Sequence, residues 1–255
     1  MILAVDIGNT NIVLGGIENG EIVFEARIAT DLIKTSDQYC AELKTMLALF
    51  EVDPKNIEGS IVSSVVPPVL NSFKTAIYKL TGKTCLVVGP GIKTGLNIRM
   101  DNPTEVGSDL IVVAVAAIAE YGTPLLLVDM GTATTITAVD ASGSFIGGCI
   151  CPGVKISMEA LTGRTAQLPG ISLEEPRCAI GKNTRDCMRS GIMYGAAAML
   201  DGLLERMEQE LGETAKVIAT GGISRFVVPL CKREIVYDRR LMLKGLYLLY
   251  SRNCK

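Results

Sequence analysis

The sequence predicts an α/β protein made of two halves that share one topology. The stretch "LAVDIGNTN" at residues 3–11 has a counterpart in "LLLVDMGTATT" at residues 125–135, so an apolar strand runs twice into an acid, a glycine and a group of hydroxyl or amide side chains. The two acids, Asp6 and Asp129, are 123 residues apart. Strand and helix patterns then alternate in both halves, which is typical of a sheet with parallel members.

The first half begins with three strand patterns joined in sequence, at residues 2–9, 10–17 and 21–28. The tripeptide "ENG" between the last two predicts a tight hairpin. A helix is predicted from Ser36, where apolar residues recur at helical spacing at Tyr39, Leu43, Met46, Leu47 and Phe50. A βαβ unit follows, with its strand, helix and strand at residues 59–68, 69–82 and 83–91.

The last helix of the first half carries start signals of its own. In "DNPTEVGSDLIVVAVAAIAEYG", Asn102 is the expected N-cap, Pro103 takes the first helical position, and Glu105 lies three residues after the cap, as in a capping box. This pattern predicts a helix that begins at Pro103 and has Asp109 near its second turn.

The second half repeats the opening order of the first. Three further strands are predicted at residues 124–131, 132–140 and 143–153. Helices around 155–163 and 184–211 lead to a strand in "KVIATGG", residues 216–222. The boundary is expected in the "EYGTP" turn, giving domains at residues 1–120 and 121–255.

The composition excludes several classes of function. A formal net charge of −2 leaves no basic field of the kind that holds nucleic acid. The longest apolar run, Leu110–Ala119, is well short of the roughly 20 residues that a spanning helix needs, so we expect a cytoplasmic protein without a membrane partner. The sequence has no histidine. Any catalysis must therefore depend on carboxylates, lysines, bound ions and backbone dipoles.

The eight cysteines are scattered and mostly flanked by apolar residues, which favours reduced, buried thiols. Cys149 and Cys151 fall on the same face of a predicted strand. Two thiolates without further ligands make a poor zinc site, so core packing is the favoured interpretation of the pair.

The two acid-glycine turns suit the binding of phosphate. A glycine after a strand lets the backbone approach a ligand, and donors are available from Asn9, Thr10 and Asn11 in the first turn and from Thr132, Thr134 and Thr135 in the second. Each acid could hold a cation or its water shell. A polyphosphate held in this way is what phosphoryl transfer requires. Each turn taken alone is equally compatible with an ordinary hairpin, but their recurrence at matching positions argues against that alternative.

A third candidate loop is "IATGG", residues 218–222. A strand that ends in two glycines, Gly221 and Gly222, lets an adenine or ribose lie against bare backbone. Many loops use glycine only as a helix cap or turn residue, so this motif by itself is weak. Its place after the two phosphate-type turns makes a nucleotide contact the favoured interpretation.

These motifs together resemble those of the sugar kinase and actin-like ATPase superfamily, and more closely those of the type III pantothenate kinases. The resemblance runs in order along essentially the whole chain, through "DIGNTN", "VSSVVP", "GPGIKTGLNIRMDNPTEVGSD", "DMGTATT", "GGCICPG", "RTAQLP", "IGKNT", "ATGG" and "GLYLLYSRN". It implies duplicated ribonuclease H-like (actin-like ATPase) domains with a nucleotide cleft between them. The implied activity is the ATP-dependent phosphorylation of pantothenate to 4′-phosphopantothenate, the first step of coenzyme A biosynthesis.

The resemblance also implies roles for individual residues. Asp109 matches the general base, although spacing alone slightly favours a surface acid there. Asp6 would anchor Mg²⁺ on the ATP phosphates, and Asp129 matches the ligand of a monovalent cation, potassium or ammonium. ATP contacts are implied for Asp6, Ile7, Gly8, Asn9, Thr10, Asn11, Ile12, Val13, Thr132, Gly221 and Gly222. Substrate contacts are implied for Met100, Gly107, Ser108, Asp109, Leu110 and Thr184, the last supplied by the partner subunit of a homodimer.

The chain departs from the family pattern beside Asp109. That pattern continues Gly-Ala-Asp-Arg with an asparagine three residues after the arginine, whereas this chain has Ser108, Leu110 and Val113 at the differing positions. Two polar groups near the base are thus replaced by apolar ones. A kinase of the same fold for another small alcohol, and a non-catalytic regulatory relative, therefore stay open as alternatives.

Overall fold

The computed structural model describes residues 1–254 and divides into two compact units. Unit 1 comprises Met1–Leu96, Asn102–Ala116 and Arg240–Lys255, and unit 2 comprises Asn97–Asp101 and Ala117–Arg239. This grouping differs from a single boundary after residue 120, because the C-terminal helix packs in unit 1. Its apolar side chains enter the core of that unit, at Leu243, Leu246 and Leu249.

The sheet of unit 1 has the strand order β3-β2-β1-β4-β5. Its strands are β1 (Ile2–Ile7), β2 (Asn11–Glu18), β3 (Glu21–Ala29), β4 (Gly59–Ser64) and β5 (Leu86–Val87). The first three form the predicted antiparallel meander, and β4 and β5 run parallel to β1. The expected hairpin is present, since Asn19 and Gly20 both have positive φ, at 51° and 90°.

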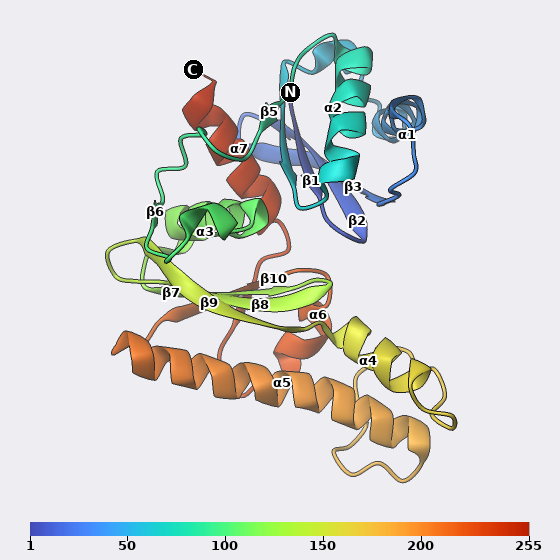
Figure 1. Cartoon of the computed structure of the whole chain (residues 1–255), viewed down its shortest axis with the longest axis vertical. Helices are drawn as coiled ribbons and strands as arrows, with labels where there is room; N and C mark the ends of the chain where they lie inside the picture. The colour runs from blue at the N-terminus through green and yellow to red at the C-terminus, as the bar shows by residue number, and fades with distance from the viewer. Residues whose placement is uncertain (255) are drawn as a thin grey trace. The chain divides into compact units, whose positions relative to one another are not determined.

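Helices cover both faces of this sheet (Figure 1). On one face lie α1 (Ser36–Leu49) and α2 (Pro67–Thr81), which place Leu43 and Phe73 in a core with Leu3 and Val5. On the other lie the first part of α3 (Ser108–Tyr121) and α7 (Leu241–Asn253). Helices α3 and α7 touch at Gly245 of α7, where Val112 of α3 leaves no room for a side chain. The central strands β1 and β4 therefore lie between two layers of helices.

The sheet of unit 2 has the order β11-β10-β7-β8-β9-β6. Its strands are β6 (Asn97–Ile98), β7 (Leu125–Met130), β8 (Ala133–Val139), β9 (Ser144–Pro152), β10 (Lys216–Thr220) and β11 (Val236–Tyr237). Read from β9 to β11, the order and the strand directions repeat those from β3 to β5 in unit 1. The predicted duplication is confirmed, and β6 is an additional edge strand parallel to β9.

The helices of unit 2 are α4 (Val154–Gly163), α5 (Thr184–Leu211) and α6 (Ser224–Val227), followed by the short 3₁₀ turn η3 (Val228–Leu230). Two further 3₁₀ turns, η1 (Pro54–Asn56) and η2 (Pro103–Glu105), lie in unit 1. The N-cap of α5 is Asn183, whose side chain accepts a hydrogen bond from the Asp186 N–H, and its C-cap is Gly212 in the left-handed region. Met193, Leu200 and Leu204 of α5 pack on the sheet. The predicted helices at 155–163 and 184–211 are therefore confirmed to within one residue.

The start of α3 differs from the prediction. The residues Pro103–Glu105 form the separate 3₁₀ turn η2, and the α-helix begins only at Ser108. Asn102 makes no side-chain cap bond to the backbone, because its side chain is hydrogen-bonded to those of Glu105 and Thr104. Val106 is extended and ends η2. Asp109 consequently lies in the first turn of the helix rather than near the second.

All eight cysteines are free thiols. Five are half-buried, but Cys178, Cys187 and Cys254 are exposed, so the expectation of buried thiols is wrong for these three. They lie in loops or at helix ends, where flanking apolar residues do not imply a core position. Burial, and then the neighbouring Cys151 thiol, raise the pKa of Cys149.

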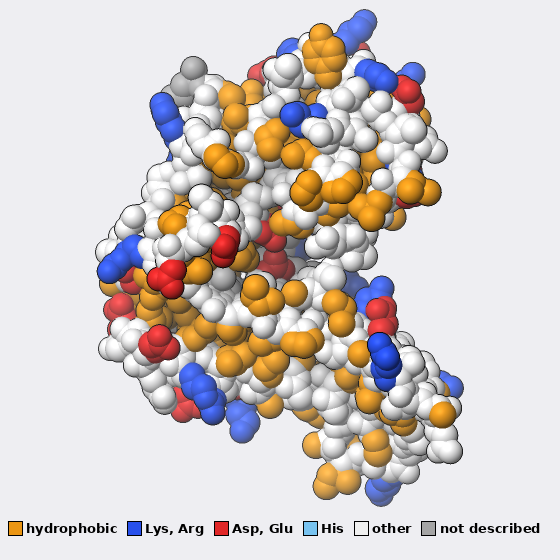
Figure 2. Space-filling view, viewed as in Figure 1, with side chains coloured by type: hydrophobic (Ala, Val, Ile, Leu, Met, Phe, Trp, Pro, Cys, Tyr) orange, Lys and Arg blue, Asp and Glu red, His pale blue; other side chains and the backbone are white. Residues whose placement is uncertain are grey.

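Figure 2 shows no single dominant patch of charged side chains on the face that it displays. Lysine and arginine are scattered over the visible face and alternate with acids (Figure 2). Among residues 1–254, each helix is either too short or too polar to cross a lipid bilayer.

Candidate active site

The Asp6 loop (residues 7–11) joins β1 to β2 and is held by backbone and side-chain hydrogen bonds. The Gly8 N–H donates to the Asn11 carbonyl at 3.0 Å. Thr30, at the end of the third strand, donates its hydroxyl to the Gly8 carbonyl at 2.6 Å and its N–H to the Thr10 carbonyl at 3.0 Å. Asn9, Thr10 and Asn11 remain exposed around this fixed turn. The loop is therefore a rigid turn with polar side chains at its surface.

The Asp129 loop (residues 130–133) is the counterpart in unit 2 and is one residue shorter between its strands. The Gly131 N–H donates to the Ala133 carbonyl at 3.0 Å. Gly153, at the end of the third strand, lies so close to the Thr132 carbonyl that a side chain there would collide with it. Thr132 itself is exposed. Thr134, a candidate donor from the sequence, is fully buried, and its hydroxyl has no hydrogen-bond partner.

The two acids occupy equivalent rungs of their sheets. Asp6 is paired with Val13 on β2 and with Ser63 on β4. Asp129 is paired with Thr135 on β8 and with Thr220 on β10. Cross-strand partners lie on the same face of a sheet, so each carboxylate has its two partners beside it. Asp129 is thus flanked by two hydroxyls, whereas Asp6 is flanked by one hydroxyl and one apolar side chain.

The glycine turn after β10 lies directly against Asp129. Gly221 has a φ of 88°, and a Cβ at this position would be 2.6 Å from both an Asp129 carboxylate oxygen and the Met130 carbonyl oxygen. Gly222 follows and is exposed. The predicted residues Asp129, Thr132, Gly221 and Gly222 therefore meet at one end of the unit 2 sheet.

Asp109 is a half-buried acid in the first turn of α3. One of its carboxylate oxygens accepts a hydrogen bond from the Leu110 N–H at 2.9 Å. The same oxygen lies over Gly107, where any side chain would displace it. Burial raises the pKa of Asp109, and the hydrogen bond from Leu110 opposes that shift. The carboxylate is therefore fixed in direction and is more basic than an ordinary aspartate.

The neighbouring Ser108 faces the strand ends of unit 1. Its hydroxyl lies 3.0 Å from the Ser63 hydroxyl and 3.2 Å from the Ser64 carbonyl oxygen. Since Ser63 is the strand partner of Asp6, these contacts bring the first turn of α3 to the same end of the sheet as the Asp6 loop. Sequence reasoning assigned no role to Ser63 or Thr30. Their only signal was a hydroxyl residue at the end of a predicted strand.

Several predicted contact residues lie elsewhere or have limited access. Ile7 and Ile12 are fully buried in the core, so only their main chain is left for a nucleotide. In unit 2, Met100 follows β6, and its sulfur lies 3.5 Å from the position that a Cβ at Gly147 would take. Thr184 is the exposed first residue of α5. Val113, where the family pattern has an asparagine, is 3% exposed and belongs to the core.

The residues around Asp129 fit an oxygen-coordinated cation. No group of three or more Asp, Glu, Cys or His side chains comes together within residues 1–254. The hydroxyl oxygen of Thr135, the strand partner of Asp129, is nevertheless buried without a hydrogen-bond partner. A carboxylate with hydroxyl and carbonyl oxygens is a donor set for a hard cation. A bound ion would account for the unpaired hydroxyl.

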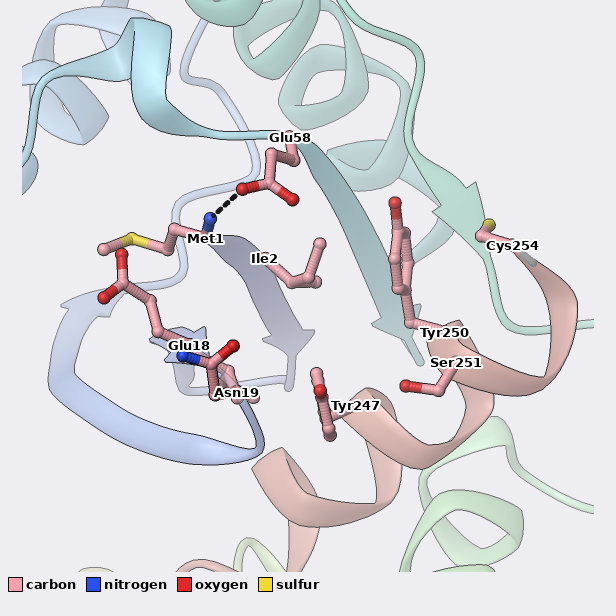
Figure 3. Close-up of a pocket in the computed structure, with 10 residues that line it drawn as sticks. Met1, Ile2, Glu18, Asn19, Glu58, Tyr247, Tyr250, Ser251 and Cys254 are labelled. Atoms are coloured by element: carbon pink, nitrogen blue, oxygen red, sulfur yellow. Dashed lines mark hydrogen bonds and ion pairs between the residues drawn. The ribbon is translucent and has the colours of Figure 1, made fainter.

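A separate pocket of about 610 Å³ lies at the opposite end of the unit 1 strands (Figure 3). Met1 and Ile2, at the start of β1, line it together with Tyr247 and Tyr250 of α7. The Met1 ammonium group pairs there with Glu58 at 2.9 Å. Asp6 is near the other end of β1, so this pocket is not part of the candidate active site.

Similar solved structures define the class of protein. A protein of Campylobacter jejuni assigned to the Baf family of transcriptional activators has 16% identity and a TM-score of 0.61, with 98% of this chain and 97% of that chain covered. Component A of (R)-2-hydroxyglutaryl-CoA dehydratase from Acidaminococcus fermentans has 13% identity and a TM-score of 0.58, with 98% and 95% covered. A protein assigned as an N-acetylmannosamine kinase from Listeria monocytogenes has 13% identity and a TM-score of 0.53, with 98% of both chains covered. The fold is that of the actin-like ATPases and sugar kinases.

Within this class, a sequence match identifies one family. The sequence model of the type III pantothenate kinases matches residues 2–206. The chain belongs to the type III pantothenate kinase family, and its activity class is that of a kinase that uses ATP with a divalent metal ion.

Proposed function

We propose that this kinase phosphorylates pantothenate with ATP to give 4′-phosphopantothenate, the first step of coenzyme A biosynthesis. The observation that carries the proposal is the fixed, half-buried Asp109 carboxylate at the start of α3 in a chain of this family. In a chain without histidine, a carboxylate of raised pKa is a suitable general base.

Asp109 acts in its deprotonated form. It accepts the proton of the substrate's primary hydroxyl while the hydroxyl oxygen attacks the γ-phosphorus and the bond to the leaving ADP oxygen breaks. The phosphoryl transition state is loose, so holding the hydroxyl in line contributes more than early removal of its proton. The bond between Asp109 and the Leu110 N–H keeps one carboxylate oxygen in place and leaves the other for the substrate.

Asp6 and the Asp6 loop are assigned to the ATP phosphates. Mg²⁺ bound to these phosphates neutralises their charge and orients the transferred group. Asp6 would hold the ion or its water ligands, and the backbone N–H groups of residues 8–11 would face phosphate oxygens. The buried side chains of Ile7 and Ile12 anchor the loop in the core and keep it rigid.

Asp129 is assigned to a monovalent cation, potassium or ammonium. The support is the carboxylate flanked by Thr135 and Thr220, together with the unpaired Thr135 hydroxyl. Thr132 and the Gly221–Gly222 turn would contact ATP beside this ion. The ion supplies positive charge for the phosphates, and Asp129 provides the one formal charge that keeps it there.

The active enzyme is proposed to be a homodimer in which Thr184 serves the partner's substrate. Its exposed position at the start of α5 supports a contact outside its own unit. Mixed dimers of Asp109→Asn and Thr184→Val chains should regain activity that neither variant has alone, because one site then carries both native residues. A fully active monomer in sedimentation experiments would contradict this assignment.

A second candidate function is a kinase for another small alcohol. The observation in its favour is Leu110, which offers no donor to the carboxylate of pantothenate. An assay coupled to ADP release, with pantothenate and a panel of small alcohols in the presence of Mg²⁺ and potassium, tests both candidates. Turnover with pantothenate above all others supports the proposal. Turnover with a different alcohol and none with pantothenate overturns it.

A further inference from the structure

We propose that Ser63 and Ser108 form a hydroxyl clamp that positions Asp109 for catalysis. The clamp joins the end of β4 to the first turn of α3 through the 3.0 Å contact between the two hydroxyl oxygens and the 3.2 Å contact from Ser108 to the Ser64 carbonyl. This inference rests on the proposed function, because it gives the pair a role in placing the proposed base. Ser63 and Ser108 are positioning residues and need not touch the substrate.

The donors in the clamp can be assigned from hydrogen-bond counting. A serine hydroxyl has a single hydrogen to donate. The Ser64 carbonyl can only accept, so the hydroxyl hydrogen of Ser108 is directed to it. Ser63 must then supply the hydrogen in the contact between the two hydroxyls. Both hydroxyls are thus satisfied within the clamp, which is consistent with the complete burial of Ser63.

The clamp acts in the first turn of α3, one turn before Val112 packs in the core of unit 1. The 3₁₀ turn η2 ends at the extended residue Val106, and Gly107 precedes the helix, so the local backbone provides little constraint. Within the first turn, Asp109 is bonded to the Leu110 N–H, and the Ile111 N–H donates to the Gly107 carbonyl at 3.2 Å. These bonds shape the turn but do not attach it to the sheet. The Ser108 hydroxyl adds hydrogen bonds from this turn to β4, beside the apolar packing of Val112.

The strand register connects the clamp to the phosphate side of unit 1. Ser63 is the β4 partner of Asp6, and Ser64 is the partner of Ile7. The helix turn that carries Asp109 is therefore linked by two hydrogen bonds to β4, which pairs with β1 beside the Asp6 loop. A displacement of about 1 Å in a reacting group can cost on the order of a hundredfold in rate, so this attachment can affect catalysis without any contact to substrate.

The test compares Ser63→Ala, Ser108→Ala, the double variant and Ser108→Thr, which keeps a hydroxyl. Ser60→Ala is the matched control, because Ser60 lies on the same strand, is buried, and has no hydrogen-bond partner for its hydroxyl. Each single alanine variant should lower kcat about tenfold with KM for ATP unchanged, and the double variant should be no worse than either single one. Ser108→Thr should retain most of the activity, and Ser60→Ala should be unaffected.

A second readout separates this proposal from the proposed function. Carboxyl carbon NMR of Asp109 follows its titration without any turnover, and loss of the clamp should lower its pKa towards the ordinary value by admitting water. If the wild type does not phosphorylate pantothenate but the titration moves only in the clamp variants, the substrate assignment fails and the clamp stands. An unchanged titration, or losses in kcat that add up in the double variant, would overturn the clamp.

Discussion

The two units of the chain use one strand scaffold for different purposes. Each unit has one acid rung, the row of paired residues that contains its acid. In unit 1 this row is Val13, Asp6 and Ser63, and in unit 2 it is Thr135, Asp129 and Thr220. The second rung has hydroxyls on both sides of the carboxylate and can surround a cation. The first has an apolar neighbour, and its hydroxyl is engaged by α3. Duplication has thus preserved the backbone while the flanking side chains have specialised.

The residues that follow the third strand of each sheet also differ, as do the helices α3 and α7 that end the two halves of the sequence. Thr30 fixes the Asp6 loop with a hydroxyl, whereas Gly153, 123 residues later, allows the Thr132 carbonyl to pack directly on the backbone. Helix α3 begins with Ser108 and Asp109, whereas α7 begins with Leu241, which is fully buried. Both of these helices pack in unit 1, but only α3 has an acid in its first turn. The rows that contain Asp6 and Asp129 do belong to different units, so each can be tested by changing its own unit.

The largest effect is expected from Asp109→Asn. The amide keeps the shape of the side chain but cannot accept the substrate proton, so kcat should fall by about 10²–10⁴. Calorimetry should show ATP affinity within about twofold of wild type. Glu105→Gln, an exposed acid in η2, is the control for loss of charge near the helix start. A loss of ATP binding in Asp109→Asn would assign the residue to unit 1 structure or metal binding instead.

The same carboxyl should set the acid side of the pH profile. Asp109 is active when deprotonated, and burial raises its pKa, so kcat should begin to fall at a higher pH than an ordinary aspartate would require. Activity is therefore present above that pKa and lost as the pH decreases through it. Measurement of kcat from pH 4 to pH 8 checks this, and a profile without an acid limb would contradict it.

Asp129→Ala tests the unit 2 rung. Removal of the carboxylate should lower kcat/KM for ATP by about a hundredfold and abolish the response to potassium, because the cation loses its only charged ligand. Glu213→Ala removes an exposed acid of the same unit and should change neither. Equal wild-type activity in sodium and potassium buffers would remove the basis for a cation at this rung.

Leu110→Arg tests the proposed substrate contact beside Asp109 in unit 1 and leaves unit 2 unchanged. A guanidinium beside Asp109 could form a charge-assisted hydrogen bond to the pantothenate carboxylate, worth about 1.5–3 kcal/mol, which corresponds to a KM roughly tenfold to a hundredfold lower. Val113 should be left unchanged, since an asparagine at this 3% exposed position would bury an amide. If KM rises while ATP affinity stays constant, Leu110 does not weaken substrate recognition.

The smallest effect is expected from Thr135→Val, which gives the unit 2 rung the apolar neighbour that Asp6 has. Loss of one oxygen near the cation should raise the potassium concentration needed for half-maximal activity by about tenfold or less. Thr137→Val makes the same change on the same strand, opposite Leu127 instead of Asp129, and should have no effect. Equal behaviour of the two variants would show that Thr135 is not a ligand.

The sequence predicted the duplicated topology because recurring apolar strands and turn residues are local signals. It placed Asp109 in the correct helix but in the wrong turn, since a capping-box spacing cannot show that the Asn102 side chain is bonded to Glu105 and Thr104. The Ser63–Ser108 contact joins residues 45 positions apart, so no local pattern could reveal it. Likewise, the sequence could not show that Thr134 is fully buried, because this depends on which face of β8 it occupies.

The placement of α7 has a consequence for synthesis of the chain. Every segment of unit 2 is translated before Arg240, whereas the core of unit 1 lacks Leu243, Leu246 and Leu249 until the last helix has emerged from the ribosome. Domains that fold during translation usually do so in order from the N-terminus. Here the second unit is the first to have all its segments available, and one face of β1 and β4 is covered only by α3 until α7 has been translated.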